Sequence, residues 1–356
     1  MSPLRLGIIG AGFGRRVHLP VLRATPGVEV AVLCTSGNRK PSSLPADVPA
    51  LRLTNRWQDL AADPMLDACV VAVPPAVQRE IVCGLLQAGK HVLSEKPFGL
   101  TLEDARAMLR AAQASGRVHT VDFQFRVHPG IRRMKELLAT ATLGPLERLD
   151  VLWLSGGRAD PMLPFSWQHE RAAGGGILNS YASHTFDYVE WLSGEPVVEL
   201  FARTDILVPA RPDSAGRLVP VTAEDSCDCV ARLASGALVN VKISNCHRHG
   251  PGHRIEAFGR LGALRFHQPQ FSQSRAFTLT FANGGAPAPV ATDGPAEWDN
   301  HAQGVAQVVA AFLLKVRGED GAEPDADFHA GLRSQVLVQA ALQSARERRA
   351  VSVSAT

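Results

Sequence analysis

The ten residues from Leu6 to Arg15, with the sequence LGIIGAGFGR, constrain the fold of this chain more than any other segment. An apolar run typical of a buried strand passes directly into closely spaced glycines, and a helical pattern follows. Gly10 permits a tight turn, and Gly12 lets the backbone approach a pyrophosphate, whose charge the helix N-terminus favours. This order predicts a dinucleotide-binding turn formed by Gly10, Gly12, Phe13, Gly14 and Arg15.

One position departs from the usual G-x-G-x-x-G pattern. The third glycine is expected at position 15, where the chain has Arg15, and Gly14 comes one place early. That glycine normally allows a helix to pack closely on its strand, so the sequence leaves open how close packing is achieved here.

Composition limits the remaining possibilities. A length of 356 residues predicts about two domains, and a net charge of +3 gives no reason to expect nucleic acid or an anionic membrane as a partner. No apolar run is long enough to span a bilayer, and Met1-Ser2-Pro3 leads straight into the first predicted strand, so we expect no signal peptide and a cytoplasmic location. The six cysteines fit reduced thiols, and the C-x-C spacing of Cys227 and Cys229 is not that of a zinc knuckle, so we expect no metal.

Strand and helix signals alternate in the first third of the chain and then change. Apolar β-rich runs at 4–9, 28–34, 68–73, 90–94 and 118–122 alternate with helices near 14–24, 57–62, 76–88 and 101–115. This predicts an α/β domain with a doubly wound parallel sheet over residues 1–122. After helices near 129–141 and 177–193 come mostly consecutive strands, which predict an α+β domain with an open, mostly antiparallel sheet over 123–356. Two helices close the chain, and the second, at about 326–347, is free to pack back on the first domain.

The end of the second strand distinguishes the two nicotinamide dinucleotides. NAD-binding folds place an Asp or Glu there for the ribose hydroxyls, whereas this chain has Cys34 followed by Thr35, Ser36, Arg39 and Lys40. Two hydroxyls and two cations suit a 2′-phosphate, which predicts NADP as the preferred cofactor and NAD as the second choice. The alternative is a solvated loop that happens to be basic.

Two further segments follow predicted strands of the first domain. Pro74 stands where a strand leaves the sheet, on the side where ligands bind in such folds. Glu95, Lys96 and Pro97 follow the strand at 90–94, which places the charged pair over the same crevice. A lysine there could stabilise alkoxide character during hydride transfer, and the alternative is a surface ion pair.

With these segments in order, and with the glycine-led stretch Gly174–Asp187, the chain resembles the Gfo/Idh/MocA family of oxidoreductases, which includes glucose–fructose oxidoreductase and inositol dehydrogenases. The resemblance covers Leu6 to about Ala345 and implies a Rossmann domain followed by a domain built on an open sheet. It implies that Lys96 contacts both the substrate and the nicotinamide region. It also implies that the open sheet forms subunit contacts, so we expect a homo-oligomer.

The family's glycine-led helix carries an Asp and, four residues later, a His as a proton-transfer pair. His184 matches the His, but Ser180 stands at the Asp position and cannot act as a carboxylate base. On a regular helix Ser180, His184 and Asp187 share one face, so His184 is the candidate general acid/base, oriented by Asp187 or Ser180. The alternative is a core histidine with Asp187 as a structural acceptor.

Three other segments carry weaker signals. Arg126 resembles a family position at the domain junction and either binds substrate oxygens or forms an inter-domain salt bridge. Trp167 lies in the irregular stretch that lines the substrate pocket of relatives. His247, His249 and His253 are interpreted as a solvated, histidine-rich loop.

These observations predict an NAD(P)-dependent oxidoreductase acting on a sugar, cyclitol or related polyol, with substrate contacts from Lys96, Arg126, Trp167, Ser180 and His184. Two rivals stay open. One is a non-catalytic dinucleotide-binding regulator, because the same architecture serves a repressor of galactose-pathway transcription and position 180 has lost its Asp. The other is a reductase of a non-sugar substrate, as in biliverdin reductase.

Overall fold

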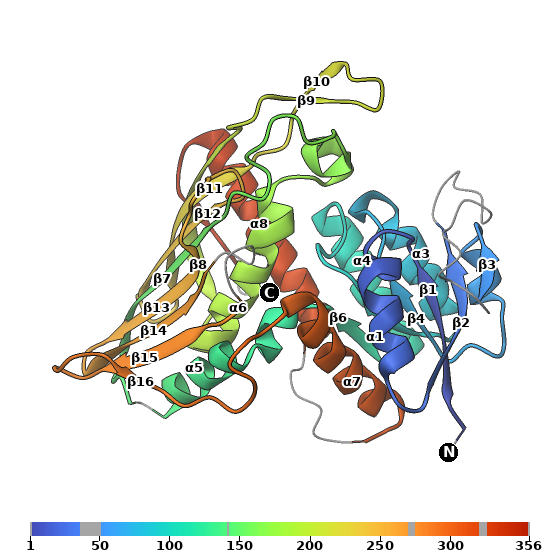
Figure 1. The fold of residues 1–356 in the computed structure, drawn as a ribbon, viewed down its shortest axis with the longest axis horizontal. Coiled ribbons are helices and arrows are strands. Elements are labelled where there is room, and N and C mark those ends of the chain that lie inside the picture. The colour runs from blue at the N-terminus through green and yellow to red at the C-terminus, as the bar shows by residue number, and fades with distance from the viewer. Residues whose placement is uncertain (1, 36–50, 141, 270–274, 320–325, 355–356) are drawn as a thin grey trace. The chain divides into compact units, whose positions relative to one another are not determined.

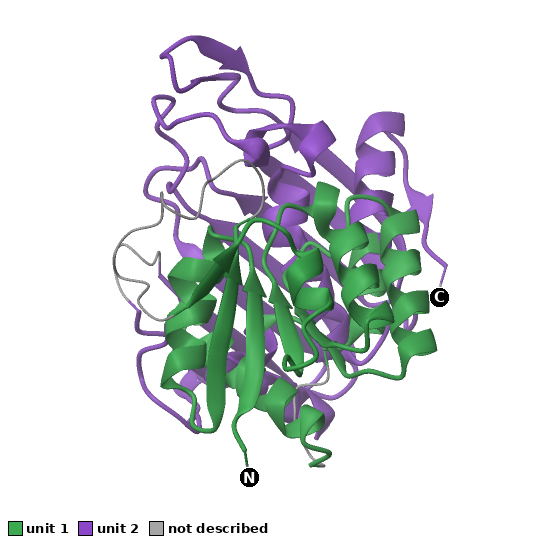
Figure 2. Ribbon diagram, turned by 90° about the vertical axis from the view of Figure 1, so that its right-hand side faces the viewer, with its two compact units in different colours: residues 1–124, 300–335 green, residues 125–299, 336–356 purple. Residues whose placement is uncertain are grey.

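The computed structural model describes residues 2–35, 51–140, 142–269, 275–319 and 326–354 (Figure 1). The chain forms two compact units, coloured separately in Figure 2. Unit 1 comprises Met1–Gln124 and Asn300–Gln335, and unit 2 comprises Phe125–Asp299 and Val336–Thr356. The segment 300–335 therefore belongs with the N-terminal unit, although it follows the second sheet in the sequence. Among the described residues, no helix combines the length and the apolar character that a membrane span requires.

Unit 1 is built on a six-stranded sheet in which every pairing is parallel. Its strands, in the order β3-β2-β1-β4-β5-β6, are β1 (Leu4–Ile9), β2 (Val28–Cys34), β3 (Arg52–Thr54), β4 (Ala68–Val71), β5 (His91–Ser94) and β6 (His119–Val121). The strand order reverses between β1 and β4, and in such folds ligands bind at that switch point, outside the carboxyl ends of the strands. The prediction of a doubly wound sheet is confirmed, with the three-residue β3 as an additional edge strand.

Helices cover both faces of this sheet (Figure 2). They are the short π-helical turn η1 (Gly14–His18), α1 (Leu19–Ala24), α2 (Gln58–Ala61), α3 (Pro75–Gln87), α4 (Leu102–Ser115), η7 (Asn300–Gly304), α7 (Val305–Val316) and the first turns of α8 (Phe328–Glu347). α4 shows how local sequence sets the bounds. The Thr101 hydroxyl accepts from the Asp104 amide, the Asp104 carboxylate accepts from the Thr101 amide, and Gly116 ends the helix with φ 62°.

Unit 2 contains a nine-stranded sheet in the order β16-β15-β14-β13-β7-β12-β11-β8-β17. The strands are β7 (Leu146–Leu154), β8 (Val197–Asp205), β11 (Ser226–Leu233), β12 (Leu238–Ser244), β13 (Gly252–Gly259), β14 (Gly262–Gln268), β15 (Thr278–Ala282), β16 (Ala288–Pro289) and β17 (Val351–Ser352). Only β7 and β12 pair in parallel among these strands. The prediction of an open, mostly antiparallel sheet is therefore confirmed. A separate hairpin is formed by β9 (Ala210–Pro212) and β10 (Leu218–Pro220).

One face of the large sheet is packed and the other is open. Helices α5 (Pro129–Ala139), α6 (Ser183–Ser193) and the later turns of α8 cover the packed face (Figure 1). β11 alternates accordingly, because Cys227 and Cys229 are buried while Asp228 and Val230 are exposed. Short turns complete the unit: η3 (Gln124–Val127), η4 (Trp167–His169), η5 (Arg171–Ala173) and the π-helical η6 (Leu178–Ala182). All six cysteines of the chain are free thiols.

Candidate functional site

The glycine turn between β1 and η1 has the geometry that a dinucleotide requires. Gly10 has φ 123°, and a Cβ at this position would collide with the carbonyl oxygen of Ala72 in the neighbouring strand connection. A Cβ at Gly12, in contrast, would meet no atom within 4 Å. The backbone at Gly12 is thus open to a ligand. These residues fit the pyrophosphate of a nicotinamide dinucleotide.

Gly14 supplies the close packing that the usual pattern assigns to its third glycine. A Cβ at Gly14 would lie 2.9 Å from Cγ2 of Ile8, a strand residue of the buried core. The displaced glycine is explained by the π-helical turn η1, which begins at this residue and changes the spacing along the helix. Arg15 is accordingly half-buried, and Gly14 is buried.

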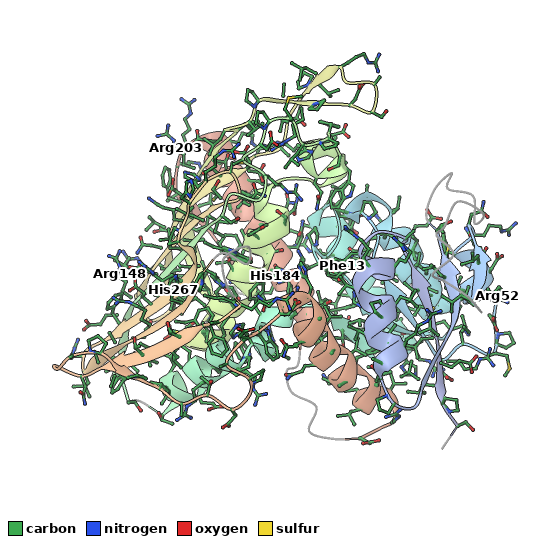
Figure 3. All side chains as sticks on the ribbon, in the orientation of Figure 1. Phe13, Arg52, Arg148, His184, Arg203 and His267 are labelled. Carbon is green, nitrogen blue, oxygen red and sulfur yellow. The ribbon has the colours of Figure 1, made fainter. Side chains whose placement is uncertain are left out.

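The residues expected around the rest of the dinucleotide are only partly described. Thr35 follows β2 and is fully buried, and its amide donates to the carbonyl oxygen of Thr54 at 2.9 Å. Ser36, Arg39 and Lys40 lie outside the described residues. Pro74 directly precedes α3, and the ring of Phe13 (labelled in Figure 3) meets the rings of His18 and His301 edge-on at 5.5 and 5.4 Å.

Glu95 is buried, so the pair Glu95-Lys96 is not simply a surface ion pair. The Glu95 carboxylate lies 2.8 Å from Nε2 of His18. The backbone oxygen of Glu95 accepts from the side-chain amide of Gln78 at 2.5 Å. Gln78 also accepts from the Gly99 amide at 2.5 Å, so one buried amide fixes both sides of the Lys96-Pro97 segment. Lys96 is half-buried, and its positive charge partly offsets the rise in the pKa of Glu95 that burial causes.

His18, Glu95 and Asp122 form a buried cluster beneath this segment. Asp122 lies 3.6 Å from Nε2 of His18, and one nitrogen or oxygen atom from each residue falls within 4.8 Å of the others. Burial raises the pKa of Glu95 and, together with repulsion from Glu95, raises that of Asp122 well above its usual range. Burial also lowers the pKa of His18. Because the acids favour their protonated forms, we interpret the cluster as hydrogen-bonded groups that share protons.

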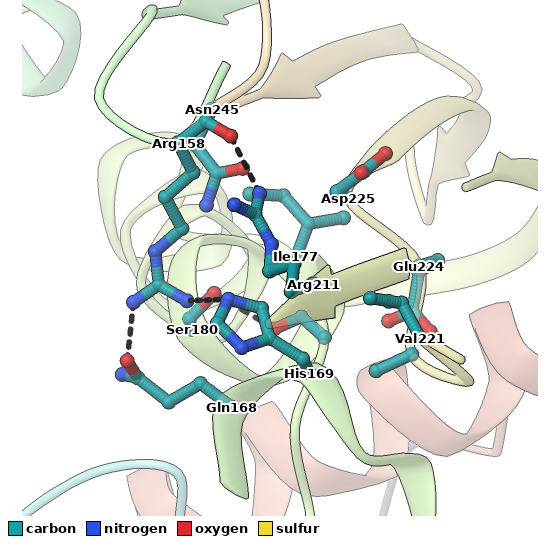
Figure 4. Close-up of a pocket in the computed structure, with 12 residues that line it drawn as sticks. Arg158, Gln168, His169, Ile177, Ser180, Arg211, Val221, Glu224, Asp225 and Asn245 are labelled. Atoms are coloured by element: carbon teal, nitrogen blue, oxygen red, sulfur yellow. Dashed lines mark hydrogen bonds between the residues drawn. The ribbon is translucent and has the colours of Figure 1, made fainter. Parts of the chain in front are cut away.

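In unit 2 the glycine-led segment begins its helix with a π-helical turn, η6, which continues into α6. This turn is wider than the regular α-helical turn that the sequence predicted for the segment containing Ser180. The Ser180 hydroxyl donates to the carbonyl oxygen of Gly176 at 2.7 Å and lines a small hollow (Figure 4). His184 (labelled in Figure 3) is 3% exposed, and its ring packs edge-on against Phe125 with 4.9 Å between centroids.

Asp187 is the carboxylate partner of Arg126. Arg126 donates from Nε to one oxygen at 2.8 Å and from a terminal nitrogen to the other at 2.5 Å. This two-point ion pair lies within unit 2. Burial raises the pKa of Asp187, and the Arg126 charge opposes that rise. Asp187 therefore serves as the ion-pair partner of Arg126. A substrate contact by Arg126 stays a prediction.

The remaining predicted positions have different surroundings. Trp167 lies in η4 and is 36% exposed. His253 corrects the interpretation of a solvated histidine loop, because it lies in β13, is 4% exposed, and its Nε2 is 2.9 Å from the Tyr188 hydroxyl. β13 pairs with two strands, so this position belongs to the core rather than to a loop.

Comparison with known proteins identifies the family of this chain. Residues 4–123 match the model GFO_IDH_MocA, described as an oxidoreductase family with an NAD-binding Rossmann fold, and residues 131–265 match the GFO/IDH/MocA C-terminal domain. The chain belongs to the GFO/IDH/MocA oxidoreductase family. The resemblance inferred from the sequence motifs is thereby confirmed, and with it an NAD(P)-dependent dehydrogenase with an NAD-binding Rossmann domain.

Three relatives illustrate the range of similarity. An uncharacterized oxidoreductase of Synechocystis is 34% identical over 263 residues, which are 73% of this chain and 71% of that protein. Levoglucosan dehydrogenase of Pseudarthrobacter phenanthrenivorans is 27% identical over 289 residues, 75% of this chain and 74% of the relative. A solved structure of levoglucosan dehydrogenase in complex with NADH and L-sorbose has a TM-score of 0.85 at 24% identity, with 99% of this chain and 100% of that chain covered. The last comparison establishes the shared fold.

Sequence reasoning missed several buried or half-buried polar residues of this family member. His18 and Asp122 gave a faint signal, since one lies on the helix after the glycine turn and the other directly follows β6. Arg158 and Arg211 gave none, because both lie in irregular or hairpin segments without periodicity. Their positions in the fold depend on tertiary packing that no local pattern encodes.

Proposed function

We propose that this protein transfers a hydride between a nicotinamide dinucleotide and the carbinol or carbonyl carbon of a sugar, cyclitol or related polyol. The observation that carries the proposal is the turn at Gly10–Gly14, whose open backbone at Gly12 suits a pyrophosphate, in a chain of this oxidoreductase family. A relative that oxidises an anhydrosugar supports a polyhydroxylated substrate. The bound dinucleotide would supply or accept the hydride.

Lys96 and His184 have the chemical properties that the protein's part of this reaction requires. The Lys96 ammonium would donate to the substrate oxygen and stabilise the negative charge that develops there as the C–H bond breaks. The neutral imidazole of His184 would accept the hydroxyl proton in the oxidative direction and return it in the reductive one. Asp187 cannot take this role while both its oxygens accept from Arg126. Arg126, Trp167 and Ser180 are the further substrate contacts that we propose.

We further propose that NADPH binds more tightly than NADH. The support is the sequence at the end of β2, where Cys34 replaces the acid that binds ribose hydroxyls and Ser36 and Arg39 follow. Losing a charge-assisted contact between Arg39 and the 2′-phosphate should cost about 1.5–3 kcal/mol, or roughly ten- to 150-fold in NADPH affinity. Fluorescence titration of wild type and Arg39→Ala with both reduced cofactors measures this. Equal or tighter NADH binding by the wild type contradicts the proposal.

The free cysteines are consistent with a reducing compartment, so we propose a cytoplasmic protein that acts on a small molecule. We also propose a homo-oligomer formed through the open face of the unit 2 sheet. On that face Val230 pairs across the strands with Phe201, and the two are 48% and 42% exposed. Adjacent exposed apolar side chains are typical of a surface that a partner copy covers.

The deciding experiment replaces the lysine. Lys96→Met keeps an apolar stem of similar length and removes the charge, so turnover should fall about 100-fold or more while cofactor affinity changes little. NADPH oxidation with ketoses and NADP⁺ reduction with polyols provide the assay. Near wild-type turnover by the variant contradicts the role of Lys96. If NADP(H) binds but no substrate in the screen is turned over, the non-catalytic regulator becomes the better interpretation.

A further inference from the structure

A small polar hollow, partly open to solvent, lies within unit 2 (Figure 4). Segments far apart in sequence line it: the irregular stretch before η4, the start of η6, strand β9 and the residues that precede β11. Arg158, His169, Ser180 and Arg211 are among its lining side chains. The hydrogen-bonding state of these groups indicates what the hollow binds.

The tautomer of His169 follows from its backbone partner. The Ser166 amide lies 3.0 Å from Nδ1, and since a backbone N–H can only donate, Nδ1 is the acceptor of a neutral ring. Burial, followed by repulsion from Arg158 and Arg211, lowers the pKa of His169 to about 4, so the ring is neutral at physiological pH. The proton therefore lies on Nε2.

This assignment makes Nε2 of His169 and the nearby guanidinium of Arg158 both donors. Nε2 and the terminal nitrogen of Arg158 are 3.5 Å apart, and two donors cannot satisfy each other. The other terminal nitrogen of Arg158 donates to the side-chain oxygen of Gln168. An acceptor oxygen beside this pair, within hydrogen-bond distance of both nitrogens, would satisfy both N–H groups.

Arg211 adds a third donor. It is 1% exposed, and its terminal nitrogens donate to the backbone oxygens of Asp160 at 2.7 Å and Arg158 at 2.5 Å. Its Nε is buried and has no hydrogen-bond partner within the described part of the chain. A buried N–H of a cationic group without an acceptor is unfavourable unless a ligand supplies one.

The two acidic residues that line the hollow, Glu224 and Asp225, have hydrogen-bond partners of their own. Glu224 accepts from the Leu178 amide at 3.2 Å and pairs with Arg171 at 3.2 Å. Asp225 accepts from the Leu207 and Val208 amides at 2.7 and 3.0 Å. Across the described residues, neither Arg158 nor Arg211 has a carboxylate within 4.0 Å. Among the described residues, the half-buried Arg158 and the buried Arg211 thus lie at the hollow without a carboxylate at ion-pair distance.

From this arrangement we propose that the hollow binds a carboxylate, and that the substrate of the enzyme is a sugar acid or similar polyhydroxy acid rather than a neutral sugar. The proposal rests on the function proposed above. A carboxylate offers a planar pair of oxygens to the fork of Arg158, and a lone pair to His169 Nε2 and to Arg211 Nε. Ser180, an alcohol where relatives carry an acid, adds no negative charge to the lining of the hollow.

The position of Ser180 links the anion site to the proposed chemistry. Ser180 lines the hollow, and His184 follows four residues later on the same continuous helix. Four residues advance a helix by about 6 Å, the length of a short carbon chain. A carboxylate held in the hollow would therefore place a hydroxyl-bearing carbon a few bonds away within reach of His184.

The test compares acidic and neutral substrates of the same carbon skeleton. D-Gluconate and D-glucuronate are assayed against sorbitol and D-glucose for kcat/KM with NADP⁺, and their binding is measured separately by calorimetry. Wild type should favour an acid over its neutral counterpart at least tenfold, and Arg158→Met should reduce that ratio at least tenfold. Arg158→Lys, which keeps the charge but loses the fork, should fall between them. Arg211 bonds the backbone oxygen of Arg158, so these variants leave that contact in place.

Arg217→Met is the matched control, since this arginine is exposed and pairs with Asp213 in the β9–β10 hairpin. It should leave the acid-to-neutral ratio unchanged. Turnover of neutral sugars without any preference for acids overturns this inference and leaves the proposed function standing. Arg158-dependent binding of gluconate or glucuronate without turnover upholds the anion site and contradicts the proposed function. A preference for glucose 6-phosphate over both acids overturns the assignment of a carboxylate.

Discussion

At the scale of single residues, His184 carries the proposed proton transfer alone. Ser180 has no acid–base range near neutral pH, and Asp187 is held by Arg126. Activity in the oxidative direction should therefore rise with pH as the His184 imidazole becomes neutral, and His184→Asn should abolish that rise together with most of the rate. The pH profile of kcat/KM checks this on any confirmed substrate. An unchanged profile in His184→Asn would show that the proton leaves by another route.

A second substitution separates proton transfer from anion binding at the same helix. Ser180→Asp restores a carboxylate near His184, which should favour the imidazolium and move the rising limb to higher pH. The same carboxylate enters the hollow beside Arg158 and His169 and should weaken the binding of acidic substrates. The two effects are read from different measurements, the pH profile with a neutral substrate and the affinity for an acid. A shift in neither would show that Ser180 faces neither group.

The residue scale also shows where sequence reasoning succeeds and where it fails. Gly10, Gly12 and Lys96 could be located because each follows a strand with a strong apolar signal. The ion pair between Arg126 and Asp187 could not, since it joins residues 61 positions apart. The donors around the hollow could not be located either, because Arg158 and Arg211 become neighbours only when an irregular segment folds against the β9–β10 hairpin.

At the scale of elements, the two π-helical turns are the features that helical periodicity misses. η1 begins at the close-packing glycine, Gly14, and η6 widens the first turn of the helix that carries Ser180 and His184. Long strands and long amphipathic helices were predictable because their periodicity extends over many residues. β3, with three residues, offers too short a pattern.

The buried cluster beneath β5 makes stability depend on pH in a defined direction. Burial, followed by repulsion from Glu95, raises the pKa of Asp122, so the native state keeps a proton that the unfolded state loses above the ordinary carboxyl range. Wild-type stability therefore falls as pH rises through that window, by at most about 1.4 kcal/mol per pH unit for one proton. The asparagine of the Asp122→Asn variant cannot ionise, so the variant does not lose stability in this way as pH rises. Its stability relative to wild type should increase between pH 5 and pH 8.

Urea unfolding at both pH values measures this difference. Asp213→Asn serves as the control, because the Arg217 backbone N–H lowers the pKa of this exposed carboxyl. The stabilising effect of the ionised Asp213 carboxylate is lost only as pH falls through the carboxyl range. A flat difference for Asp122→Asn would mean that Asp122 is ionised in the native protein.

At the scale of the whole molecule, each unit has its own core, yet the chain passes between them three times. The last passage lies inside α8, whose first turns belong to unit 1 and whose later turns belong to unit 2. If one unit unfolded alone, α8 would have to break in its middle, which is unfavourable because helix formation is cooperative. We therefore expect the two units to unfold in one transition.

The tryptophans make this expectation measurable. Trp57 is in unit 1, whereas Trp153, Trp167, Trp191 and Trp298 are in unit 2, so fluorescence reports mainly on unit 2. NADP⁺ would bind the glycine turn of unit 1, and a ligand at 100 times its Kd stabilises the folded state by about 2.7 kcal/mol. If the units unfold together, NADP⁺ raises the urea midpoint of the fluorescence signal as much as that of circular dichroism. If the fluorescence midpoint stays fixed while the circular dichroism transition splits, unit 2 unfolds independently and α8 does not couple them.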